Sequence, residues 1–479
     1  MKIKILGAFL AVFAMGCGVP QAQLTCGDGT ILNGKSCVPI TTLRCASGTH
    51  EEAGECLADP PTLISCGVGT HLDGTACVID APPNPPPSPW SQPVFVCQTG
   101  LACSDPTLVL TPAGAVVAVS ESGDSASTVG VFRQTTSGFE LAKRFEGASS
   151  VAITPSIAIR GSTMYLVYTD YEPSQTQRYG TGDLMLSISS DFGVTWSAPR
   201  RINAMPATTL LYSPRIIVSS DGVDVLYIDT DGVQTQDNYL VHSNDEGQTF
   251  SEPIALPSGG TYDSLSPAAS PIRVGNTLEV PMIRSGYDVS TGGNLSSVEV
   301  LSITPDPQTM NMQTQTTRVK RVFASRDFPL DPVPVLDANA NGVRCLAYVD
   351  APSRDYSIYV VRSEGPIDGS VRPALVPGGP GSVQTAPAIA ATPGGDCALA
   401  WLDNRSGAWE LYESALLADG TWRTPVKVSA MSFTEDGVTK SLSAKLSMRI
   451  DGSRRFLAWS DFDNGVESVS FSSAPLVTQ

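Results

Sequence analysis

The chain has 479 residues and a formal net charge of −17, with 47 acidic side chains against 30 basic ones. This excess of negative charge argues against nucleic acid and anionic lipid surfaces as partners, because both repel an acidic protein. The 43 glycines and 37 prolines indicate many turns rather than long helices, and the length allows several domains.

Residues 1–16 have the pattern of an export signal. Two lysines precede an apolar run, residues 5–14, which is too short to anchor the chain by spanning a bilayer. The sequence Ala-Met-Gly-Cys at 14–17 resembles the lipobox of bacterial lipoproteins, so Cys17 is the expected lipidation site. By that resemblance, the glycine after Cys17 favours the outer membrane or cell surface of a Gram-negative bacterium. The alternative is an ordinary signal peptide cut near Ala22.

Residues 17–80 form a cysteine-rich stalk in this interpretation. Three C-x10-C repeats predict three two-stranded hairpins, each closed by a disulfide that supplies about 3 kcal/mol to a loop without a core. Pairing within each repeat is one of fifteen arrangements that six cysteines allow. A receptor-like contact module is the alternative to a stiff stalk. The predicted pairs are Cys26 with Cys37, Cys45 with Cys56, and Cys66 with Cys77.

Residues 81–89 are rich in proline and predict a semi-rigid polyproline II linker. From residue 90 to 479 the chain repeats units of roughly fifty to sixty residues with several short strands each, which is typical of a β-propeller. Seven units can be counted, and six remain an alternative because the unit around 266–314 fits least well. Residues 90–97 resemble an outer strand and are expected to complete the last unit, which removes an open sheet edge.

One phrase of the form S-x-D-x-G-x-T-aromatic occurs twice, at 189–196 and at 243–250. Its chemistry suits a tight turn, in which the aspartate accepts backbone N–H groups and the glycine takes a positive φ. At these residues the sequence resembles the Asp-box proteins, the sialidase-like β-propellers. The resemblance implies an all-β fold, a seven-bladed or six-bladed propeller preceded by the disulfide-rich stalk. It implies little about function, since the Asp box of that family is structural.

Four further cysteines lie in the repeating region. Cys97 and Cys103 flank the join between the closing strand and the first unit, and Cys345 and Cys397 have nearly equivalent places in neighbouring units. Both spacings predict disulfides, as expected of an exported protein, and free buried thiols are the alternative.

Candidate ligand-binding residues come from an aromatic-x-acid pattern that ends the second strand of most units. Equivalent positions of a propeller form a ring about its axis, so this pattern predicts six acids and one arginine on the face opposite the two turns. The alternative is that each acid caps its own loop. The ring consists of Glu121, Asp170, Asp229, Arg284, Asp350, Asp403 and Asp461.

No catalytic residue is predicted. The sialidase family needs three arginines, the first in an R-I-P phrase, and this chain contains no such phrase. The loop arginines that remain are Arg178, Arg284, Arg354 and Arg405. The sequence therefore predicts recognition of a glycan or an envelope protein without catalysis, with no cofactor and no metal. An exo-acting glycosidase of the sialidase type is the alternative, and an envelope scaffold is a third interpretation.

Overall fold

The structure is a computed structural model, which describes residues 88–476 apart from 98–100, 124–125, 148–150, 174–179, 204–206, 231–235, 257–270, 289–292, 306–311, 323–333, 351–355, 380, 433–443 and 464–465. Before residue 88 it describes Cys26 and short segments of three hairpins. The chain divides into two compact units, Met1–Pro85 and Pro86–Gln479. Within the described residues, no helix is long and apolar enough to cross a membrane.

Three antiparallel hairpins make up the described part of the first unit, as the C-x10-C repeats predict. Their pairings place Leu32 opposite Cys37, Leu72 opposite Cys77 and Glu51 opposite Cys56. Cys26 and Cys37 form a disulfide with their Cα atoms 5.6 Å apart. The other two predicted pairs lie partly or wholly outside the described residues. The strands are β1 (Thr30–Asn33), β2 (Ser36–Pro39), β3 (Thr49–Glu52), β4 (Glu55–Ala58), β5 (Thr70–Asp73) and β6 (Ala76–Ile79).

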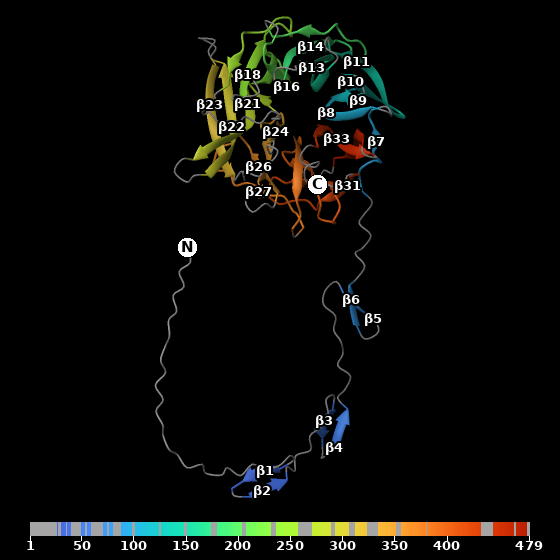
Figure 1. Cartoon of the computed structure of the whole chain (residues 1–479), viewed down its shortest axis with the longest axis vertical. Coiled ribbons are helices and arrows are strands. Elements are labelled where there is room, and N and C mark those ends of the chain that lie inside the picture. Colours follow the sequence, from blue (N-terminus) through green and yellow to red (C-terminus); the bar gives the residue numbers. More distant parts are fainter. Residues whose placement is uncertain are drawn as a thin grey trace, which may run out of the picture. The chain divides into compact units, whose positions relative to one another are not determined.

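The second unit is all-β in its described residues, and its sheets follow one another around a circle from β8 to β34 (Figure 1). The first sheet contains β8 (Ala102–Thr111), β9 (Gly114–Ser122), β10 (Ser127–Thr135) and β11 (Gly138–Glu146). An eight-stranded sheet follows, with β12 (Ala152–Arg160), β13 (Thr163–Glu172), β14 (Thr181–Ser189), β15 (Arg200–Arg201), β16 (Leu210–Ser219), β17 (Gly222–Thr230), β18 (Gln236–Ser243) and β19 (Ile254–Ala255). Its two halves are joined by one parallel pairing, between Gly182 and Leu210.

Four more four-stranded sheets complete the circle. One contains β20 (Ile272–Val274), β21 (Thr277–Asp288), β22 (Gly293–Pro305) and β23 (Met312–Val322). The next contains β24 (Val335–Ala338), β25 (Arg344–Asp350), β26 (Ser357–Ser363) and β27 (Ala374–Leu375). Then come β28 (Gln384–Ala391), β29 (Cys397–Asp403), β30 (Glu410–Leu416) and β31 (Val426–Ala430), and finally β32 (Leu446–Asp451), β33 (Arg454–Asp463), β34 (Val466–Pro475) and β7 (Val94–Phe95).

The core lies between consecutive sheets. Second strands such as β25 and β29 are buried along their whole length, because neighbouring sheets cover both of their faces. The aromatic of the aromatic-x-acid pattern lies in this core: Trp401 and Trp459 are almost fully buried. This arrangement explains why the second strands are continuous apolar runs in the sequence. Consecutive four-stranded sheets arranged in a circle are the architecture of a β-propeller.

The predicted closing strand is confirmed. β7 pairs with β34, with Phe95 opposite Ser470 and Val94 opposite Phe471. The first residues of the propeller thus form the outer strand of its last sheet, and Trp90 is buried in the same core. The two ends of the propeller are thereby hydrogen-bonded to each other.

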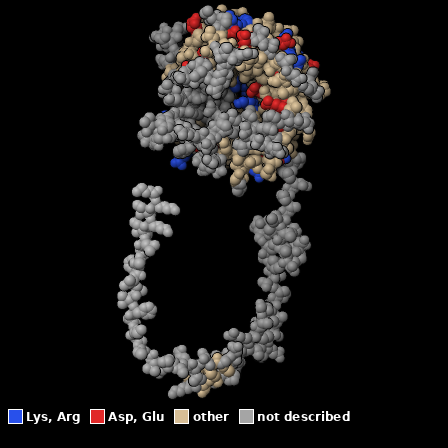
Figure 2. All heavy atoms as spheres, viewed as in Figure 1, with Lys and Arg blue, Asp and Glu red and all other residues tan. Residues whose placement is uncertain are grey.

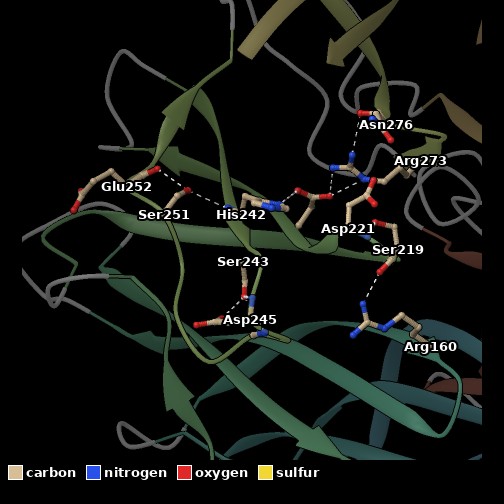
Figure 3. Close-up of polar contacts among 12 residues, drawn as sticks. Arg160, Ser219, Asp221, His242, Ser243, Asp245, Ser251, Glu252, Arg273 and Asn276 are labelled. Carbon is tan, nitrogen blue, oxygen red and sulfur yellow. Dashed lines mark hydrogen bonds and ion pairs between the residues drawn. The ribbon is translucent and has the colours of Figure 1, made fainter. Parts of the chain in front are cut away.

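Neighbouring sheets are also tied by covalent and ionic contacts. The predicted disulfides Cys97–Cys103 and Cys345–Cys397 are both present, and the second joins β25 to β29. Buried ion pairs connect Asp224 of β17 with Arg273 of β20, and Glu413 of β30 with Arg455 of β33. His242 also contacts the Asp224 carboxylate of the first ion pair, with His242 Nδ1 2.8 Å from Asp224 Oδ1 (Figure 3).

Candidate binding site at the propeller axis

The two S-x-D-x-G-x-T turns have the contacts that the sequence predicts. In the first turn, Asp191 Oδ1 accepts the Thr195 backbone N–H at 2.8 Å and Oδ2 accepts the Thr195 hydroxyl at 2.6 Å. Asp245 and Thr249 repeat both bonds at the same distances. Gly193 and Gly247 have φ of +81° and +83°, which favour glycine.

These hydrogen bonds hold the pKa of Asp191 and Asp245 at about 2, because the hydroxyl and backbone N–H of the following threonine stabilise the charged form. Both carboxylates bond within their own turn. The turns are therefore structural elements of the sheets, and their carboxylates are not candidate ligand-binding groups.

Three acids of the predicted ring are held by neighbouring residues. Glu121 is buried and accepts a bidentate pair from Arg144, at 2.7 and 2.9 Å. Asp403 is fully buried and accepts the Arg405 backbone N–H at 2.8 Å and its guanidinium at 2.5 Å. Asp461 accepts the Ser432 backbone N–H at 2.9 Å. Of these contacts, only the bond from the Arg405 backbone to Asp403 is the capping of an acid's own loop that the alternative interpretation describes.

The other members of the ring are less fully described. Asp350 is buried, Asp170 and Asp229 are half-buried, and each also interacts with other parts of the chain. Arg284 pairs through its backbone with Ser297, and its side chain lies outside the described residues. Ligand binding by this ring stays a prediction. Of the loop arginines, Arg405 forms an ion pair with Asp403, and Arg178 and Arg354 lie outside the described residues.

A different set of residues lies at the same end of the inner strands. The first strands of consecutive sheets, from β8 to β32, lie against one another, and β32 lies against β8. Four of these inner strands have a register shift near their start. At each shift, the residue before a proline has a positive φ although it is not a glycine. Such strained positions concentrate at functional sites. They are Asp105, Thr154, Ser213 and Ala386.

Charged side chains gather at these shifts. Asp105 is one of the strained residues, Lys445 occupies the corresponding place in the last sheet, and Arg215 lies two residues after Ser213. Asp105 interacts electrostatically with Arg215, with Lys445 and with Glu467 at the start of β34. We call these four residues the axial cluster. Basic and acidic atoms lie together in the hollow at the centre of the propeller in Figure 2.

The surroundings of the axial cluster weaken the charged forms. All four side chains are half-buried. Desolvation lowers the pKa of Arg215 and of Lys445, while Asp105 opposes that shift in both. Desolvation, aided by the charge of Asp105, raises the pKa of Glu467 to about 7. Among the described residues, neither Arg215 nor Lys445 forms an ion pair, and the guanidinium of Arg215 donates only to its neighbour's carbonyl, Pro214 O, at 3.0 Å.

The axial cluster was not predicted from the sequence. The proline that opens most inner strands was a usable signal, because the strained residue precedes it and Arg215 follows Pro214 directly. In the last unit no proline marks the place of Lys445. The electrostatic interaction between Asp105 and Glu467, more than three hundred residues apart, arises only because the circle of sheets closes.

Comparison with known proteins gives only distant structural likenesses. No family model matches this chain, and no curated protein matches it. A protein of unknown function from Dyadobacter fermentans is similar over 81% of this chain and 99% of its own, at 10% identity and a TM-score of 0.48. A Hadza microbial sialidase is similar over 75% and 76%, at 14% identity and 0.43. An ulvan lyase, a polysaccharide lyase, is similar over 79% and 94%, at 13% identity and 0.48.

Proposed function

We propose that this protein is an exported, lipid-anchored cell-surface β-propeller of seven blades that recognises an anionic glycan or protein partner without catalysis. The export signal and Cys17 support the anchor. The described residues of the propeller form six sheets, one of them double, and this arrangement supports seven blades. The recognition is placed at the axial cluster.

The pair of cations carries this proposal. Arg215 and Lys445 are half-buried on inner strands, and within the described part of the chain each lacks an ion pair. Half-buried cations are costly unless negative groups compensate them, and Asp105 supplies one negative charge for the two cations. A carboxylate or sulfate at the axis would accept charge-assisted hydrogen bonds from both, in the way that guanidinium and ammonium groups bind anions. A central hollow favours the acidic end of a glycan over a flat protein surface.

The test is a glycan array probed with the full chain carrying Cys17→Ser, which cannot be lipidated. We expect glycans bearing uronate, sialate or sulfate to be retained and neutral ones not. The double variant Arg215→Ala/Lys445→Ala should lose this retention. Arg449→Ala is the matched control, because Arg449 is an exposed arginine further along an inner strand. Retention of neutral glycans alone, or equal retention by the double variant, would contradict the proposal.

One observation favours the alternative, an exo-acting glycosidase. Glu467 and Asp105 are two carboxyl groups that interact electrostatically, and the pKa of Glu467 is raised to about 7, as glycoside hydrolysis requires of its acid. A panel of fluorogenic glycosides that includes a sialoside decides between the two. Turnover that disappears in Glu467→Gln would establish the glycosidase, and absence of turnover together with array binding supports recognition.

A further inference from the structure

The outer strand β23 differs in length from the other outer strands of the propeller. It is the last strand of its sheet, paired on one side with β22, and it lies at the rim of the circle of sheets (Figure 1). It has 11 residues, whereas β7, β15, β19 and β27 have two each and β31 has five. A long edge strand presents a row of unpaired backbone N–H and C=O groups, to which a further strand can pair.

The accessible part of this edge ends at a bulge. Val319 is an extra residue in the pairing of β23 with β22. It is buried in one cluster with Ile367, from the loop between β26 and β27, so this loop covers the strand at the bulge. Before the bulge, four of the five side chains from Thr314 to Arg318 are exposed. We call Met312–Arg318 the free edge.

The charges of β23 are all of one sign. The strand contains Arg318, Lys320 and Arg321 and no acidic residue, whereas the long outer strand β11 contains two acids and two bases. The Arg318 side chain is 58% exposed while its Nε donates to the buried Glu299 at 3.4 Å, which fixes the guanidinium at one end of the free edge. Charges of exposed groups more than about 8 Å away are largely screened at physiological ionic strength. The bases of β23, rather than the net charge of the chain, therefore act on a segment bound at this edge.

We infer that the free edge binds an extended acidic segment of a partner protein, which adds a fifth strand to this sheet. Main-chain hydrogen bonds supply the affinity in this mode of recognition, and side chains supply the specificity. Acidic side chains beside Arg318 form favourable cross-strand pairs with it. A second copy of β23 is a poorer occupant, because it brings three more bases and another chain of net charge −17 to the same edge.

A labelled six-residue peptide that alternates valine and glutamate tests the inference by fluorescence anisotropy. The peptide is titrated with the full chain carrying Cys17→Ser, and the same peptide with lysine in place of glutamate is the control ligand. We expect saturable binding of the acidic peptide and none of the basic one. Absence of binding, or equal binding of the two peptides, would overturn the inference.

The axial cluster is a second place where an acidic peptide could bind, and its variant separates the two sites. Arg215→Ala/Lys445→Ala should bind the acidic peptide as the unaltered chain does, because the free edge lies on an outer strand. Loss of peptide binding in this double variant would place the peptide at the axis and overturn the inference. The inference does not depend on the proposed function, which the glycan array tests separately.

Reversal of one charge tests the choice of an acidic partner. Arg318→Glu should weaken binding of the acidic peptide by about fivefold or more, because a cross-strand attraction becomes a repulsion. Lys143→Glu is the matched control, since Lys143 is an exposed base on the outer strand β11, and its affinity should be unchanged. Equal affinities of the two variants would contradict the inference.

Two proline variants test the backbone contact. Neighbouring residues of an edge strand direct their N–H groups to opposite sides, so one of Gln315→Pro and Thr316→Pro removes an N–H that faces β22 and the other an N–H that faces solvent. We expect the first to lower Tm. The second should keep Tm and bind the acidic peptide at least about tenfold more weakly, because one acceptor of the peptide loses its donor.

Two outcomes of the proline experiment would overturn the inference. The first is that the variant with an unchanged Tm also binds the peptide with unchanged affinity. The second is that light scattering shows the chain to be a dimer without peptide and the same variant to be a monomer, which would assign the free edge to a second copy.

Discussion

At the scale of single residues, the propeller contains carboxyl groups whose pKa values are shifted in opposite directions. Asp191 and Asp245 accept hydrogen bonds within their turns, which stabilise the charged form and hold their pKa at about 2. Glu467 is desolvated beside Asp105, which stabilises its neutral form and raises its pKa to about 7. Each shift predicts a different dependence of stability on pH.

Glu467→Gln should stabilise the protein at high pH. The folded-state pKa of about 7 lies above the ordinary glutamate value of about 4.3. Ionisation of Glu467 therefore costs stability as pH rises from the lower value to the higher one. At pH 8 the variant should be more stable by about 1–3 kcal/mol, and at pH 4 nearly equal to the unaltered chain. Urea unfolding at both pH values measures this difference; a variant that is less stable at pH 8 would contradict the account.

Asp191→Asn should destabilise the protein at neutral pH, whereas Glu467→Gln should stabilise it at high pH. A depressed pKa stabilises the folded state above the ordinary aspartate pKa of about 3.9, and this contribution is lost as pH falls towards about 2. The variant should lower Tm at pH 7 and have little effect at pH 2. Calorimetry at the two pH values checks this, with Asp221→Asn as the control, because the exposed Asp221 carboxylate accepts a bond from the Ser220 hydroxyl and, among the described residues, none from a backbone N–H.

At the scale of elements, strands of neighbouring sheets are joined by buried ion pairs whose members cannot be removed singly without cost. Glu413 of β30 and Arg455 of β33 are both almost completely buried. By contrast, Glu246 lies three-quarters exposed beside Arg160. The stability lost when one partner of an ion pair is removed therefore depends on how deeply the pair is buried.

Glu413→Gln should destabilise the protein by about 3–5 kcal/mol, because Arg455 would keep a buried charge without its partner. Glu246→Gln removes an ion pair of the same kind at the surface and should cost less than about 1 kcal/mol. Urea unfolding of the two variants compares them directly. Equal effects would show that the sheets do not depend on the buried pair.

At the scale of the whole molecule, the circle of sheets is closed by contacts between the first and the last residues of the propeller. Trp90 is buried in the core of the last sheet, while Phe95 in the same closing segment is 59% exposed. Closure also brings Asp105 and Glu467 together. The same event thus completes both the last sheet and the axial cluster.

Trp90→Ala should cost about 3–5 kcal/mol, as expected for loss of a buried tryptophan. Phe95→Ala removes an exposed ring from the same segment and should cost less than about 1 kcal/mol. Thermal unfolding of both variants measures this. A small effect of Trp90→Ala would mean that the closing segment contributes little to stability.

Much of the fold could be predicted from the sequence, because repeats, turns and closing strand depend on local patterns. The glycine and aspartate of each turn, and the resemblance of residues 90–97 to an outer strand, are visible without a structure. The axial cluster could not be predicted, since it joins Asp105 to Glu467 across the closed circle. The predicted acid ring selected positions such as Asp403, which the structure shows bonded to its own loop.

The central claim is that Arg215 and Lys445 bind an anion at the propeller axis. Titration of D-glucuronate into three single variants tests it most directly: Arg215→Ala, Lys445→Ala and the control Arg449→Ala. The account predicts at least about tenfold weaker binding in the first two, since each loses a charged hydrogen bond worth about 1.5–3 kcal/mol, and unchanged binding in the third. Equal affinities in all three variants would contradict it.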